Sequence, residues 1–144
     1  MKYTLNIEID LPREKVIELF DNPDNLKHWQ PGLISYEHLS GTFGQPGSKT
    51  KLLYRMNRRE VEMIETLTVH NLPDEISGTY EAKGVWNLMK NTFDETDKGS
   101  TIYTAETEFK AKGFMKLMLA LMPGAFKKQT FKYMKLFKEF AENS

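Results

Sequence analysis

The sequence contains no cysteine, so disulfide bonds and thiol nucleophiles are excluded from its chemistry. It also contains no glycine-rich phosphate-binding loop, dinucleotide fingerprint or G-x-S-x-G nucleophile motif. Its histidines, His28, His38 and His70, stand far apart and lack the spacing of metal ligands. We therefore expect no metal and no nucleotide cofactor.

Long hydrophobic runs are missing as well. No stretch approaches the roughly 20 apolar residues that a membrane-spanning helix requires. The first residues, MKYTLNIEID, alternate between apolar and polar side chains, unlike the apolar block of a secretory signal peptide. Hydrophobic residues make up 40% and charged residues 28% of the chain, which is ordinary for a folded protein. We expect a soluble, cytoplasmic protein with a single domain over residues 1–144.

Charge is balanced overall but unevenly placed. Residues 1–109 carry a net charge of −6, and residues 110–144 carry +6. A basic segment of this kind can contact anionic partners, or it can simply form a solvated helix face. Because the segment has no arginine and no recognised binding motif, we expect no nucleic-acid partner. A weak contact with an anionic membrane surface stays open.

The hydrophobic pattern predicts one strand, two short helices, six strands and a long helix. Apolar residues at every second position predict a half-buried strand over residues 2–10. Two short helices are expected before Pro31-Gly32, and six strands at hairpin spacing follow. These strands cover residues 33–43, 49–56, 60–70, 76–83, 85–95 and 101–111. The terminal helix runs from Phe114 to Glu142 and is interrupted at Pro123-Gly124.

This element order resembles that of the START-like, or SRPBCC, helix-grip superfamily, which includes birch-pollen-allergen-like and polyketide cyclase/dehydrase-like proteins. Two stretches also carry the resemblance, PREKVIELFDNPDNLKHWQPGL and ETLTVHNLPDEISGTYEAKG. It implies an α+β fold in which a curved seven-stranded antiparallel sheet wraps around the C-terminal helix, with two short helices between strands 1 and 2. An apolar cavity would lie between sheet and helix. A lipocalin-like barrel, the alternative, would place more strands before any helix.

One carboxylate stands out in the stretch VEMIETLTV. Alternation places Glu65 on the same strand face as Val61, Met63, Leu67 and Val69, which we expect to point inward. A buried carboxylate is costly without a partner. Glu65 is therefore either a cavity residue with a raised pKa, a ligand contact and candidate catalytic acid/base, or a structural group paired near a strand end.

Other ligand-binding candidates come from the inward faces and the C-terminal segment. Inward tyrosines could hold the oxygen atoms of a ligand, or could simply pack in the core. Strands 33–43 and 85–95 have ambiguous alternation, so that either Tyr36 or Glu37, and either Trp86 or Asn87, points inward. With Glu65, the predicted ligand-binding residues are Tyr54, Tyr80, Tyr103, Met63, Trp29, Met118, Met122, Phe126 and Met134.

The stretch FMKLMLALMPG is apolar on nearly all sides, and Lys116 is its one charged residue. A surface helix normally has a polar face, so this segment should be covered on both sides or adaptable. Methionine suits the walls of pockets that accept varied apolar ligands. The segment could be a lid that moves at Pro123-Gly124, a doubly buried helix or a dimer contact.

Three functions follow from these observations. The first is binding or carrying a hydrophobic small molecule, such as a lipid, isoprenoid or polyketide-like compound, in the internal cavity. The second is a cyclase/dehydrase-like or hydrolase-like enzyme that uses Glu65 and a tyrosine as acid and base. The third is a protein-interaction module that uses the lysine-rich C-terminal helix. Since the sequence shows no catalytic constellation, we favour binding over catalysis, in a monomer or a homodimer.

Overall fold

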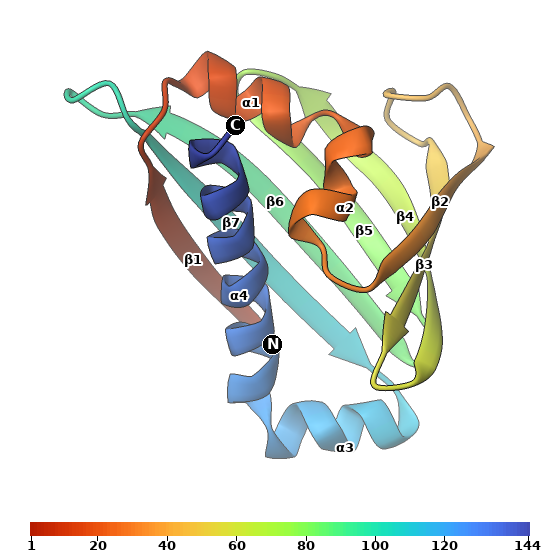
Figure 1. Ribbon diagram of the computed structural model, residues 1–144. Coiled ribbons are helices and arrows are strands. Elements are labelled where there is room, and N and C mark those ends of the chain that lie inside the picture. Colours follow the sequence, from red (N-terminus) through yellow and green to blue (C-terminus); the bar gives the residue numbers. More distant parts are fainter.

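The computed structural model describes residues 1–144 and contains the predicted elements in the predicted order (Figure 1). The strands are β1 (Lys2–Ile9), β2 (Leu33–Ser40), β3 (Lys49–Met56), β4 (Arg59–Asn71), β5 (Glu75–Ala82), β6 (Val85–Glu95) and β7 (Thr101–Ala111). The helices are α1 (Arg13–Phe20), α2 (Leu26–Trp29), α3 (Gly113–Leu121) and α4 (Pro123–Glu142). No helix has the length and apolar character needed to cross a membrane.

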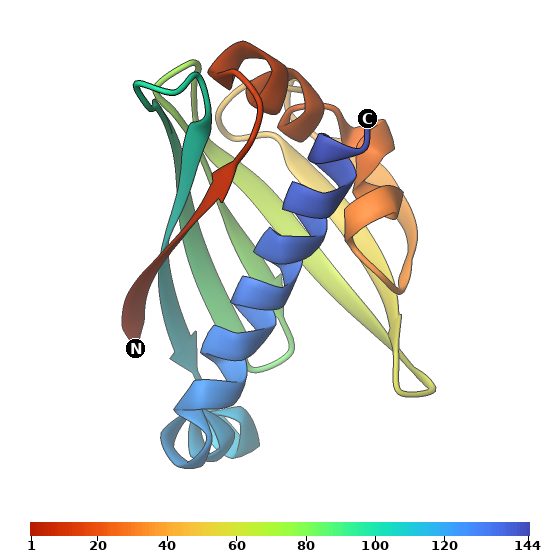
Figure 2. The ribbon, with the colours of Figure 1, turned by 60° about the vertical axis from the view of Figure 1, so that its left-hand side comes forward.

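The strands form one antiparallel sheet in the order β1-β7-β6-β5-β4-β3-β2. Each strand from β2 to β7 therefore pairs with its neighbour in sequence, as hairpin spacing predicts. The first strand then closes onto β7 at the far edge, where Leu5 pairs with Ala105. The sheet curves around α4, which crosses its concave side (Figure 2). This is the helix-grip arrangement that the sequence resemblance implied.

The C-terminal half of α4 is held by a stripe of small and apolar side chains. Thr130, Met134, Phe137 and Ala141 recur at spacings of three and four residues, and all are buried. Around Phe137, which is 0% exposed, lie Phe20 of α1 and Tyr103 of β7, with ring centroids 5.3 and 6.1 Å away. This end of the concave face is therefore filled by aromatic packing.

A β-bulge changes which side chains of β4 face α4. Leu67 pairs with Gly78, but Val69 pairs with Ser77 and His70 with Ile76, so one residue is inserted between Leu67 and Val69. Simple alternation predicted that Val69 points inward, and this was wrong. The inserted residue reverses the parity and places His70 on the concave face instead.

The register also resolves the two ambiguous strands. Tyr36 pairs with the buried Leu52 and so shares the concave face. Asn87 is buried, and its side-chain amide donates to the Glu108 carbonyl oxygen at 3.0 Å. Trp86 lies on the opposite face, where the Lys110 ammonium sits 5.0 Å from its ring centroid.

Candidate functional site

The candidate site is built around a row of polar side chains in the middle of the concave face. Thr50 pairs with Glu65, Glu65 with Tyr80, and Tyr80 with Asn87, so the row crosses β3, β4, β5 and β6. Side chains that face each other across adjacent strands lie on the same side of a sheet, about 4.5–5.5 Å apart at Cβ. Glu65 therefore has polar neighbours from other strands that its own strand did not reveal.

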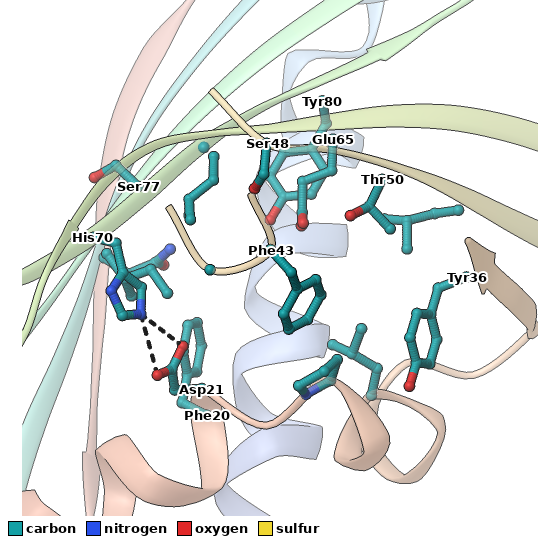
Figure 3. Close-up of a pocket in the computed structure, with 18 of the residues that line it drawn as sticks. Phe20, Asp21, Tyr36, Phe43, Ser48, Thr50, Glu65, His70, Ser77 and Tyr80 are labelled. Atoms are coloured by element: carbon teal, nitrogen blue, oxygen red, sulfur yellow. Dashed lines mark hydrogen bonds and ion pairs between the residues drawn. The ribbon is translucent and has the colours of Figure 1, made fainter. Parts of the chain in front are cut away.

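Glu65 and Tyr80 form the chemical centre of this row. Figure 3 shows the two side chains side by side, with their oxygen atoms directed into a pocket. Burial raises the pKa of the Glu65 carboxyl, and the Tyr80 hydroxyl, which can donate to the ionised form, offsets part of that rise. Burial and the charge of Glu65 raise the pKa of Tyr80 well above 10, so its hydroxyl stays protonated at neutral pH.

The pocket has a volume of about 140 Å³ and lies between this row and the α1–α2 segment. Nine of its 20 lining residues are hydrophobic, so it is more polar than the mostly apolar cavity expected from the sequence. Its apolar walls come from the helical side and from the sheet: Phe20, Leu26, Trp29, Leu52, Leu67 and Ile76. The pocket thus combines the polar row with apolar walls.

The β2–β3 connection borders the pocket on its open side. Phe43 of this connection lines the pocket although its side chain is 57% exposed. Tyr36 lines it too, and the Tyr36 hydroxyl donates to the Asp24 carboxylate at 2.6 Å. The aromatic side chains of Phe43 and Tyr36 therefore border the opening between the pocket and solvent.

An Asp–His pair at one end of the pocket was missed by the sequence analysis. The Asp21 carboxylate, directly after α1, lies 3.1 and 3.2 Å from Nε2 of His70, and both residues line the pocket (Figure 3). No sequence signal located the pair, because His70 reaches the concave face only through the β4 bulge. The described chain holds no cluster of three or more side chains able to bind a metal.

Trp29 packs in the core and also lines the pocket. Its ring packs between Phe20 and Phe137, with centroids 5.7 and 5.1 Å away, so it fixes the helices to the core. It also lines the pocket and is 8% exposed, and its indole Nε1 has no hydrogen-bond partner in the protein. A buried donor without a partner is unusual and suits a ligand or a water molecule.

Glu65, Tyr80 and Trp29 are the predicted residues that the pocket brings together. The Tyr54 hydroxyl instead donates to Oε1 of Gln30 at 2.6 Å, which links β3 to the end of α2. The Tyr103 hydroxyl donates to Oδ1 of Asn91 at 2.9 Å inside the aromatic packing. The other predicted residues lie outside the pocket lining: Met63, Met118, Met122, Phe126 and Met134.

Comparison with known proteins gives one family match. The sequence model of the family described as polyketide cyclase/dehydrase and lipid transport matches residues 1–135. No curated protein matches the chain closely enough in sequence to count as a relative.

Solved structures share the fold at low sequence identity. A conserved protein from Geobacillus kaustophilus is 17% identical with a TM-score of 0.82, and the match covers 100% of this chain and 97% of that chain. Ara h 8.0201 is also 17% identical, with a TM-score of 0.75 over 100% of both chains. A START superfamily protein from Mycobacterium smegmatis is 12% identical, with a TM-score of 0.76 over 99% of this chain and 97% of that chain. These similarities show the helix-grip fold.

Proposed function

Because the chain belongs to the polyketide cyclase/dehydrase and lipid-transport family, we propose that it binds a small, mainly apolar molecule in the pocket beneath α1 and α2. Family and fold are of a type that binds hydrophobic ligands. The observation that carries the proposal is the half-buried Glu65–Tyr80 pair at the base of a pocket with apolar walls. Such pockets usually combine apolar lining with a few polar groups that orient the ligand.

The volume of the pocket limits the part of the ligand that it encloses. An apolar cavity of about 150 Å³ accommodates one benzene molecule. A pocket of about 140 Å³ therefore encloses one ring or a short branched chain, and a longer ligand extends past Phe43. The enclosed end should carry a hydroxyl or carbonyl oxygen, since Glu65 can accept a hydrogen bond and the Tyr80 hydroxyl can donate one.

A matched pair of probes tests this proposal. p-Cresol and p-xylene have similar shapes, but only p-cresol has a hydroxyl group. In calorimetric or NMR titrations p-cresol should bind up to about tenfold more tightly, which corresponds to one hydrogen bond. The Tyr80→Phe variant should reduce that preference, and the control Tyr103→Phe should keep it. Equal affinities for the two probes, or no binding of either, would contradict the proposal.

The Glu65–Tyr80 pair also supports catalysis as a second candidate function. A carboxylate with a raised pKa is a stronger base than an ordinary one, and a protonated tyrosine can stabilise an enolate oxygen. Glu65 would take the α-proton of a bound ketone while the electron pair moves to the oxygen beside Tyr80. The proton on the Glu65 carboxyl would then exchange with D2O for a deuteron, and transfer of that deuteron to the enolate would place deuterium on the α-carbon and regenerate the carboxylate and the ketone.

Cyclohexanone in D2O is a suitable probe for this chemistry because it has one ring. NMR should show α-proton exchange that is faster than in buffer and is lost in Glu65→Gln. The Tyr103→Phe control should leave the exchange unchanged. Exchange at the buffer rate with the unmodified protein would reject the catalytic candidate and leave the binding proposal standing.

A further inference from the structure

Helix α3 has an uncovered apolar face. Phe114, Leu117 and Leu121 follow the i, i+3, i+7 spacing of one helix face, and their side chains are 70%, 52% and 69% exposed. Met122, directly after the helix, is 50% exposed. Exposed large apolar side chains that gather on one face mark a contact surface.

The opposite face of α3 holds the helix on the protein. Met115, Met118 and Leu119 are half-buried, and Met115 packs at the β5–β6 turn, where its side chain would meet a Cβ added at Gly84. None of the α3 residues lines the pocket. The helix is therefore not doubly buried, and it does not cover the pocket as a lid in this structure.

Exposed lysines lie within α3 and next to it in the sequence, and acidic residues are absent from this part of the chain. Lys112 directly precedes α3, Lys116 lies within it, and Lys127 and Lys128 follow in the first turns of α4. All four side chains are exposed. No aspartate or glutamate occurs between residues 110 and 138. Figures 1 and 2 show α3 at the end of the molecule opposite to α1, where it projects beyond the strands.

We infer that α3 docks on an anionic lipid bilayer. Phe114, Leu117 and Leu121 enter the boundary between headgroups and acyl chains, and the lysines contact the negatively charged headgroups. A flat surface with an apolar layer beneath anionic groups complements both features of this end of the molecule. No helix is both long and apolar enough to span the bilayer, and α3 has only 9 residues, so α3 lies in the bilayer surface.

A second copy of the chain fits this surface less well. A symmetric dimer through α3 would place the same patch against itself, so the lysines of one copy would approach those of the other. With no carboxylate between residues 110 and 138, this segment offers nothing to neutralise that charge. An anionic bilayer supplies the opposite charge.

Sedimentation with vesicles tests the inference on the full chain. Phosphatidylcholine vesicles containing phosphatidylglycerol should bind the protein, pure phosphatidylcholine vesicles should bind it much less, and added salt should weaken the binding. In the Phe114→Ser/Leu121→Ser variant, the partition coefficient onto these anionic vesicles should fall by about tenfold or more. In the Lys127→Gln/Lys128→Gln variant, the same partition coefficient should fall by about tenfold or more, and the remaining binding should depend less on salt.

A second exposed apolar pair provides the matched control. Ile34 and Leu39 of β2 are 48% and 45% exposed, and Ile34→Ser/Leu39→Ser should leave vesicle binding unchanged. Thermal melts verify that each variant is folded. The inference is overturned if anionic vesicles do not bind, or if the β2 control loses as much binding as the α3 variant. It is also overturned if sedimentation velocity without lipid shows a dimer that the α3 substitutions dissociate.

Discussion

The two ends of the concave face differ in what covers them. Beneath the C-terminal half of α4, the Phe93, Tyr103 and Phe137 rings pack into a filled core. Beneath the α1–α2 segment, the sheet carries Glu65 and Tyr80 beside a pocket of about 140 Å³. The same curved sheet thus has a packed end and a hollow end. Phe20 and Trp29 border both parts.

Two inward tyrosines show the consequence of that difference. The Tyr103 hydroxyl, itself outside the pocket lining, donates to Asn91, which borders the pocket, and so serves the structure. The Tyr80 hydroxyl lies beside a half-buried carboxylate and lines the pocket. Both residues are tyrosines, and both lie on the concave face of the sheet. Substitutions at the packed end should therefore reduce stability, and those at the hollow end should change binding and pH dependence.

The largest expected effect is at the centre of the packed end. Phe137→Ala removes a fully buried ring that contacts Phe20, Trp29 and Tyr103. The free energy of unfolding should fall by about 3–5 kcal/mol, as measured by urea denaturation. Phe114→Ala, at a side chain that is 70% exposed, is the control and should change it by less than about 0.5 kcal/mol. Similar losses of unfolding free energy in the two variants would contradict the conclusion that Phe137 lies in a packed core.

The two tyrosines give the next largest effect. Tyr103→Phe leaves Oδ1 of the buried Asn91 without its donor, which should cost about 1–3 kcal/mol of unfolding free energy. Tyr80→Phe should cost less, because its hydroxyl faces the pocket. Urea denaturation of both variants compares them directly. A larger loss in Tyr80→Phe would mean that the Tyr80 hydroxyl is part of the packed structure.

Glu65 should make stability depend on pH in a defined direction. Its pKa in the folded protein is raised above the ordinary value of 4.5, so the folded state holds the proton more tightly than the unfolded chain. The contribution of this carboxyl is most favourable below pH 4.5, and it decreases as the pH rises through the raised pKa. Glu65→Gln cannot ionise and should gain stability relative to the unmodified protein across that range.

Urea denaturation of both proteins at a series of pH values measures this difference. The control is Glu62→Gln, because Glu62 lies on the same strand and is exposed. The stability of Glu62→Gln relative to the unmodified protein should vary less with pH in this range than that of Glu65→Gln. A difference between Glu65→Gln and the unmodified protein that stays constant with pH would contradict the burial of Glu65.

The smallest expected effect is at the Asp21–His70 pair. Their side chains are 37% and 26% exposed, and a partly exposed contact of this kind contributes at most about 1 kcal/mol. Asp21→Asn should therefore lower the free energy of unfolding by less than this amount, as measured by urea denaturation. A loss as large as that of Tyr103→Phe would show that this pair, and not the packed end alone, holds α1 on the sheet.

Local sequence patterns predicted the elements and their order, and the family resemblance implied the curved sheet around the C-terminal helix. Alternating apolar residues located the strands, and hairpin spacing predicted their order. Alternation also placed Glu65 on the inner face of β4. These features depend on residues that are close together in the chain.

The rest of the site depends on contacts that local patterns do not record. The bulge after Leu67 reversed the parity of β4 and brought His70 to Asp21. Tyr80 and Tyr103 have equivalent patterns, and only the positions of the helices distinguish their surroundings. For the same reason, the sequence placed Met118 and Met122 at the cavity, whereas they lie outside the pocket lining.

The two tryptophans allow the most direct test of a ligand-binding hollow end. Trp29 lines the pocket and its buried indole N–H has no protein partner, while Trp86 lies on the opposite face beneath Lys110. Each should give one indole N–H signal in a two-dimensional ¹⁵N–¹H NMR spectrum. Titration with p-cresol should shift the Trp29 signal progressively and leave the Trp86 signal in place. If neither signal moves at saturating p-cresol, or if Trp86 moves instead of Trp29, the hollow end is not the binding site.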